Sequence, residues 1–158
     1  MRPSWDEYFI KMAFLVAERS TCLRHHVGAI LVKERQVLTT GYNGAAKGID
    51  DCMALGCLRD QLKIKSGERH EICRAIHAEQ NAIIQAGVHG VNINGSTLYC
   101  THSPCIICAK MIVNSGIKRI VIGSDYPDDF NLVMDLLEEA KVTLKRLHPT
   151  DFTIKTLK

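Results

Sequence analysis

The sequence predicts a three-layer α/β domain with a central, five-stranded mixed sheet. Two strand-like segments stand next to each other near the N-terminus, and helical and strand-like segments then alternate along the rest of the chain. That order is typical of a sheet covered by helices on both faces. The chain has 158 residues, 46% of them hydrophobic and 23% charged, which suits a single globular domain over residues 1–158.

The N-terminal part supplies one helix and two strands. Apolar residues recur at helical spacing over residues 4–19, which predicts an amphipathic helix. Residues 27–32 and 36–41 are predicted strands, joined by a turn at Lys33-Glu34-Arg35. Residues 44–70 are polar, turn-rich and contain cysteines. A connection of that length is uncommon in a compact domain unless something holds it in place.

The C-terminal part alternates helices with strands. Gly87 and Gly116 stand where helices are expected to stop, and Pro104 stands where one is expected to begin. The helices are predicted over residues 75–86, from Pro104 to about Ser115 and over 129–140, and the strands over residues 96–101, 119–122 and 142–147.

Composition and charge exclude several classes of protein. The formal net charge of +3 and the pI of about 8.5 are weak for a nucleic-acid binder, and the basic stretches are short. No apolar run approaches the roughly 18 residues of a membrane span. The first residues carry acids and an aromatic where a signal peptide would need an apolar core. We therefore expect a soluble, cytoplasmic protein with no nucleic-acid or membrane partner.

Two short motifs carry the chemistry. His77-Ala78-Glu79 opens one predicted helix, and Pro104-Cys105-Ile106-Ile107-Cys108 opens another. Seven cysteines in a cytosolic chain favour metal binding or catalysis over disulfides. One imidazole and two thiolates give zinc three protein ligands and leave the fourth position for water. Zinc lowers the pKa of such a water towards 7, which makes it a nucleophile at neutral pH.

The carboxyl group of Glu79 completes this pattern. Beside a metal it can take the proton of the water and return it to the ring nitrogen and the leaving ammonia. A His-x-Glu motif followed by Pro-Cys-x-x-Cys is the signature of zinc deaminases. The alternatives are a redox pair or a structural zinc at Cys105 and Cys108, and a core histidine at His77.

Four stretches together resemble one family more specifically: Val27-Gly28-Ala29-Ile30, Gly41-Tyr42-Asn43-Gly44, His77-Ala78-Glu79-Gln80-Asn81-Ala82-Ile83 and Ser103-Pro104-Cys105-Ile106-Ile107-Cys108-Ala109-Lys110. They resemble deoxycytidylate deaminases, and most closely the late-competence-protein branch. The likeness extends from the first helix to about Leu147. It implies a cytidine deaminase-like fold and the conversion of dCMP and water to dUMP and ammonia, which supplies dUMP for thymidylate synthesis.

The resemblance also implies substrate contacts. Asn43 would hydrogen-bond the 3′-hydroxyl of the sugar. The alternative is a turn residue beside Gly44, and both roles can hold at once. The backbone N–H of Ala78 would face the cytosine carbonyl, and carbonyls near His102 and Ser103 would accept from the exocyclic amine. Tyr126 would lie near the active site, unless it only shapes a turn. The group that contacts the phosphate is open, with Arg24, His25 and His26 as candidates by charge alone.

Regulation and assembly follow from the resemblance alone. Family members are commonly hexamers that dCTP activates and dTTP inhibits, at a site that involves the Gly-Tyr-Asn-Gly loop and magnesium. A homo-oligomer, effector nucleotides and Mg²⁺ are therefore expected, with Gly41, Asn43 and Gly44 as the residues concerned.

Soft metal donors also gather around residues 44–73. A second, structural zinc would supply the energy that orders this segment. Some viral relatives carry such a zinc at positions that match Cys22, Cys52 and His70, and Cys73 stands in for their acidic fourth ligand. Cys57 is a rival ligand, because a local set of four could be made by Cys52, Cys57, His70 and Cys73 alone. The alternative is that these are free thiols in a reducing cell.

Two rival functions remain. A tRNA adenosine deaminase shares both catalytic motifs, but it needs a basic surface for folded RNA. A non-enzymatic, zinc-stabilised module in DNA uptake is the other rival. Glu79 argues against that module, because a structural zinc has no use for a proton shuttle.

Overall fold

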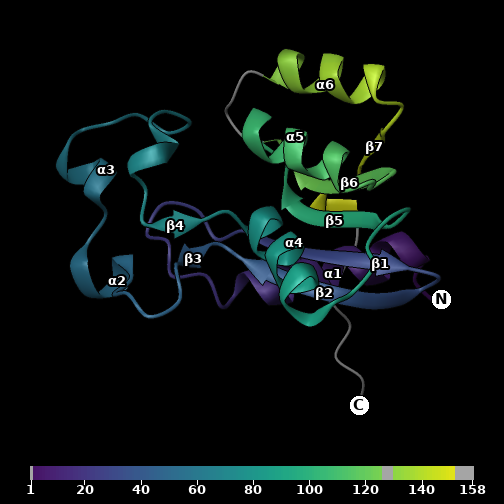
Figure 1. The fold of residues 1–158 in the computed structure, drawn as a ribbon, viewed down its shortest axis with the longest axis horizontal. Coiled ribbons are helices and arrows are strands. Elements are labelled where there is room, and N and C mark those ends of the chain that lie inside the picture. Colours follow the sequence, from purple (N-terminus) through teal and green to yellow (C-terminus); the bar gives the residue numbers. More distant parts are fainter. Residues whose placement is uncertain (1, 126–129, 152–158) are drawn as a thin grey trace.

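A computed structural model describes residues 2–125 and 130–151. Its main sheet has five strands in the order β2-β1-β5-β6-β7 (Figure 1). β1 pairs antiparallel with β2 and β5, whereas β5, β6 and β7 are parallel neighbours. The predicted α/β class and five-stranded mixed sheet are therefore confirmed. The strands are β1 (Gly28–Lys33), β2 (Gln36–Tyr42), β5 (Thr97–His102), β6 (Arg119–Ser124) and β7 (Thr143–Arg146).

Helices cover both faces of this sheet. Successive strand side chains point to opposite faces, so each inner strand contributes to two cores. Ile30 and Val32 of β1 pack with the helix α1 (Trp5–Ala17), whereas Ala29 and Leu31 of β1 face the opposite layer. That opposite layer consists of α4 (Ala78–His89), α5 (Ile106–Asn114) and α6 (Phe130–Glu139).

The turn between β1 and β2 is short because its backbone is left-handed. Glu34 and Arg35 have φ values of 51° and 63°, which is the geometry of a two-residue hairpin turn that matches the twist of the strands. The other helices and strands of the sheet lie within a few residues of their predicted bounds. Among the described residues, none of the helices has both the length and the apolar composition of a membrane span.

The helix predicted over residues 75–86 has different bounds at both ends. Ala75–Ile76 form strand β4, which pairs antiparallel with β3 (Gly44–Ala45), and His77 then caps α4. At the other end the helix continues through Gly87, because a glycine in an exposed helix costs only about 1 kcal/mol. Gly90, in the left-handed conformation, ends it instead.

The cysteine-bearing segment contains short elements only. They are α2 (Cys52–Leu55), α3 (Leu58–Gln61) and the 3₁₀ turn η1 (His70–Ile72), and a further 3₁₀ turn, η2 (Pro149–Asp151), follows β7. The segment projects to one side of the sheet in Figure 1, between β3 and β4. Its position beside the start of α4 makes it a wall of the site described next.

Candidate active site

Three donor atoms converge at the N-termini of two helices. The Nδ1 of His77 lies 3.5 Å from the Sγ of Cys105 and 3.3 Å from the Sγ of Cys108. Zinc bonds of about 2.0 Å to nitrogen and about 2.3 Å to sulfur, at tetrahedral angles, separate those atoms by roughly 3.5 Å. The three side chains therefore fit a zinc ion without rearrangement, as both motifs predict.

The local fold explains why these atoms meet. His77 caps α4 directly after β4, and Cys105 caps α5 at the end of the segment that follows β5. Helix α5 begins at Ile106, so Cys105 precedes the helix rather than lying within it as predicted from the sequence. The thiols still share one side, because the Sγ of Cys105 accepts the backbone N–H of Cys108 at 3.5 Å.

Hydrogen bonding shifts the pKa values of the two thiols in opposite directions. The Cys108 thiol and the His77 ring stabilise a thiolate at Cys105, and together they lower its pKa to about 4. The pKa of Cys108 is raised, because its proton is shared with Cys105 and because the side chain is fully buried. A metal-binding thiolate is thus present at neutral pH, and a cation would displace the remaining proton.

The carboxyl group of Glu79 is buried beside this centre. Only 4% of the residue is exposed, and burial raises its pKa to about 7 despite the opposing effect of His77. A bound cation would lower that pKa. A carboxyl group that titrates close to neutrality can both accept and donate a proton, which is what general acid–base catalysis requires.

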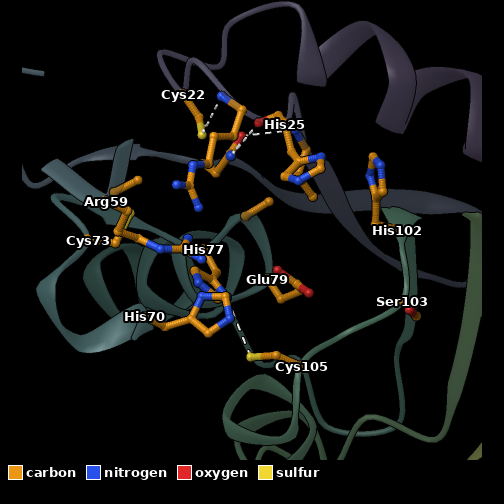
Figure 2. A pocket seen from close by; sticks show the side chains of 15 residues that line it. Cys22, His25, Arg59, His70, Cys73, His77, Glu79, His102, Ser103 and Cys105 are labelled. Carbon is orange, nitrogen blue, oxygen red and sulfur yellow. Dashed lines mark hydrogen bonds between the residues drawn. The ribbon is translucent and has the colours of Figure 1, made fainter. Parts of the chain in front are cut away.

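A cavity of about 550 Å³, its open mouth included, contains these groups. This volume lies within the usual range of small-molecule sites. Three of the four residues predicted to contact a substrate line it: Asn43, Ala78 and Ser103. The fourth, Tyr126, lies outside the described residues. Figure 2 shows Glu79, His77 and Cys105 around one end of the cavity, with His25 and His102 along another side.

The amide of Asn43 is held in place by protein groups. Its Nδ2 donates to the carbonyl of His25 at 2.7 Å, and its Oδ1 accepts from the backbone N–H of Val27 and from the hydroxyl of Ser20. These bonds fix the side chain at the cavity wall and join the segment after α1 to the end of β2. Asn43 therefore shapes the site, and its second amide N–H remains a donor for a ligand.

Contacts between α4 and β2 position the catalytic helix. A Cβ atom at Gly41 would lie 2.2 Å from the carbonyl oxygen of Ala78 and 2.4 Å from the nitrogen of Ala82, so only glycine permits this approach. The side chain of Asn81 donates to the carbonyl of Tyr42 at 2.8 Å. Gly41 and Asn81 thus hold the start of α4, with its Glu79, against the sheet.

The residues predicted for a second zinc lie near one another but not within bonding geometry. Among the described residues, His77, Cys105 and Cys108 form the one group of three or more ligand atoms within 4.8 Å of one another. His70 packs its ring against His77, with the centroids 4.9 Å apart, and lines the catalytic cavity. Burial raises the pKa of Cys52, and the neighbouring thiols add to the effect: Cys73, Cys57 and Cys22.

Arg59 is a site residue that the sequence did not indicate. It belongs to α3, is only 4% exposed and lines the cavity. Arg24, a candidate for phosphate contact, also lines the cavity, but its Nε binds Asp60 at 2.7 Å and its Nη2 donates to the carbonyl of Ile64 at 2.6 Å. Nothing in the local pattern around Arg59 reveals its burial, since that depends on how the segment folds.

Comparison with known proteins agrees with this geometry. Residues 3–124 match the family model described as the cytidine and deoxycytidylate deaminase zinc-binding region. The chain belongs to this family. Members include the deoxycytidylate deaminase of Schizosaccharomyces pombe, 39% identical over 97% of this chain and 47% of the yeast protein. The ComE operon protein 2 of Bacillus subtilis is 38% identical over 92% of this chain and 72% of that protein.

A solved structure of a family member shows the same fold. The dCMP deaminase of cyanophage S-TIM5, in complex with dCMP and dUMP, superposes with a TM-score of 0.74 at 32% identity, and the match covers 93% of this chain and 99% of the phage protein. The resemblance to deoxycytidylate deaminases is therefore confirmed. The chain spans about half the length of the Schizosaccharomyces pombe relative.

Proposed function

We propose that this protein is a zinc-dependent deaminase that converts dCMP and water to dUMP and ammonia. The observation that carries the proposal is the convergence of His77, Cys105 and Cys108 on one point, with the buried carboxyl group of Glu79 beside it in an open cavity. The names of the relatives, and the dCMP and dUMP bound to the phage protein, support the choice of substrate.

The residues of the chain divide the work. When bound at His77, Cys105 and Cys108, zinc supplies a Lewis acid that makes water a nucleophile near neutral pH. Glu79 takes the proton of the attacking water, delivers it to the ring nitrogen of cytosine, and assists the departure of ammonia. The backbone N–H of Ala78 and the carbonyl of Ser103 hold the base, and Asn43 holds the sugar. Because Glu79 is buried, water other than the attacking one does not compete for its proton.

Substitution of Glu79 by glutamine tests the mechanism. The amide keeps the size of the side chain but cannot carry the proton, so kcat for dCMP should fall at least about 10²-fold, the usual contribution of general acid–base catalysis. Zinc content and thermal stability should stay at wild-type values. Glu71→Gln, the same change at an exposed position of η1, is the matched control. Wild-type turnover of dCMP by Glu79→Gln would refute the role of Glu79 in proton transfer.

Substrate assays distinguish the rivals. Ammonia released from dCMP and inosine formed in tRNA are measured with the same preparation. Turnover of dCMP alone supports the proposal, and inosine formation would favour a tRNA adenosine deaminase. If neither substrate reacts while the protein contains zinc and is folded, a zinc-stabilised module in DNA uptake becomes the better description.

We also propose a second, structural zinc in the segment 44–73. The ligands that the sequence favours are Cys22, Cys52, His70 and Cys73. Because the ring of His70 packs against His77, we propose that Cys57 replaces His70 as the fourth ligand. Cys52 and Cys57 are buried at the starts of α2 and α3, where a metal would join these short helices to the rest of the chain.

Zinc analysis separates the two ligand sets. Two zinc ions per chain are expected for the wild type, and one for Cys57→Ser. Cys100→Ser is the control, because Cys100 is fully buried in β5 and packs in the core. Two zinc ions per chain in Cys57→Ser, with one in His70→Ala, would show that His70 and not Cys57 is the fourth ligand, as the sequence favours. The cytoplasm suits both sites, since thiols stay reduced there.

Assembly and regulation are proposed on the resemblance. We expect a homo-oligomer, with a hexamer favoured, that dCTP activates and dTTP inhibits with Mg²⁺ at Gly41, Asn43 and Gly44. Large apolar side chains exposed on the described surface, such as Leu15, Met53 and Leu62, support self-association. Light scattering gives the subunit number, and dCMP turnover with each triphosphate, with and without Mg²⁺, tests the effectors.

A further inference from the structure

Arg59 is a buried cation with no carboxylate partner among the described residues. Its Nη2 donates to the carbonyl of Lys65 at 3.1 Å, and its Nε is buried with no hydrogen-bond partner among the described residues. No described carboxylate lies within salt-bridge distance of its guanidinium. A buried charge in this condition is unfavourable by several kcal/mol unless something pairs with it.

The surroundings of Arg59 identify the missing partner as an anion. Of the described residues that line the cavity, Glu79 is the one with a carboxyl group, and it is already assigned to proton transfer. The thiolate of Cys105 also lines the cavity, but it faces His77 and Cys108 as a metal ligand. Arg24 is the second guanidinium at the cavity, but Asp60 neutralises it. Burial lowers the pKa of His25, and the two arginines lower it further, so the same cationic field reaches this ring. The cavity therefore has an excess of positive charge on the side of α3.

The orientation of the side chain agrees with this electrostatic pattern. Figure 2 shows Arg59 extending from the side of Cys73 into the space where His70 and His77 lie, and the residue is only 4% exposed. A guanidinium presents several N–H donors in a rigid fork that matches the oxygens of a phosphate group. Lysine, a point charge on a flexible stem, would match them less well.

We propose that Arg59 binds the 5′-phosphate of the nucleotide substrate and thereby selects nucleotides over nucleosides. This inference rests on the proposed deaminase function. Its Nε, which has no hydrogen-bond partner in the part of the chain that the structure describes, and its Nη groups donate to the phosphate oxygens. The salt bridge between Arg24 and Asp60 holds α3 in place. Arg59 precedes Asp60 in α3, so the same salt bridge keeps Arg59 at the cavity.

The experiment compares dCMP with 2′-deoxycytidine as substrates. In Arg59→Met the ratio of kcat/KM for dCMP to kcat/KM for 2′-deoxycytidine should fall about 100-fold, because hydrogen bonds to a charged partner are lost. Arg59→Lys keeps the charge and should recover part of the ratio. Arg69→Met, which removes an exposed arginine of the same segment, is the matched control and should keep the wild-type ratio. An equal loss on both substrates would show a structural role and overturn the inference.

Binding of dUMP separates this inference from the proposed function. Calorimetry with dUMP, and with inorganic phosphate as competitor, does not require turnover. Weaker binding of dUMP to Arg59→Met than to the wild type, at unchanged melting temperature and zinc content, supports the phosphate contact even if dCMP is not deaminated. Equal affinity in both proteins, or no binding of dUMP or phosphate to the wild type, would overturn it.

Discussion

Replacement of Gly41 by alanine tests whether the contact between β2 and α4 positions the catalytic residues. The added Cβ would lie 2.2 Å from the carbonyl oxygen of Ala78, the residue between His77 and Glu79. Because non-bonded heavy atoms prefer separations of about 3.5 Å, the start of α4 has to move by roughly 1 Å. Such overpacking costs about 1–3 kcal/mol of stability. A displacement of about 1 Å at reacting groups lowers activity about 10²-fold.

Gly87→Ala is the matched control on the same helix. No atom lies within 4 Å of a Cβ at this position, and Gly87 is inside α4. Alanine should therefore stabilise the helix by about 0.5–1 kcal/mol and leave catalysis unchanged. Both variants are measured by thermal unfolding and by kcat/KM for dCMP. If Gly41→Ala has the melting temperature and the activity of the wild type, the contact does not position the site.

Two further predictions concern stability and metal content. Asp6 is bound by Arg119, and Lys145 also contacts it, so that its pKa is held well below the usual range although burial opposes this. A depressed pKa stabilises the fold fully above the unfolded pKa of about 4, and this contribution is lost progressively as the pH falls from there through the lower pKa of the folded state. Asp6→Asn should therefore lower the free energy of unfolding by about 1–3 kcal/mol at pH 7, measured by denaturant titration. At pH 3 the difference in free energy between variant and wild type should be smaller. A difference that does not change with pH would contradict the assignment. Incubation with 1,10-phenanthroline should abolish dCMP turnover and added Zn²⁺ should restore it, and activity that persists in protein shown to be zinc-free would rule out the metal mechanism.

The sheet and the metal centre were predictable because they are local in the sequence. In the strands, alternation of side chains between two helical layers leaves apolar runs, as at Ala29 to Val32. In the metal centre, two ligands come from one five-residue motif, and the third lies two residues from Glu79. Each motif also stands at a helix start, where backbone N–H groups without intrahelical partners favour thiolates and ligands.

Features that depend on distant partners were not predictable. Ala75–Ile76 form a strand only because Gly44–Ala45 lie beside them, some thirty residues away in the sequence. The strand moves the start of α4 to Ala78 and makes His77 a capping residue. The burial of Arg59 has the same cause, because the salt bridge between Arg24 and Asp60 brings α3 to the cavity from another part of the chain. No spacing pattern encodes either contact.

The division between predictable and unpredictable residues follows a division of function. The proposed proton transfer and the metal binding rely on helix starts fixed to the sheet, where a Cβ at Gly41 would already be too large. The proposed substrate selection, by contrast, relies on Arg59 in a segment with little core of its own. Arg24 holds α3 and the residues after it at the cavity, through Asp60 and the carbonyl of Ile64. A change in α3 is therefore expected to alter which nucleotide is accepted without moving the starts of α4 and α5. The same separation explains how one metal centre serves deaminases of different substrates, since the pocket around the site sets the choice of base and of its attached groups.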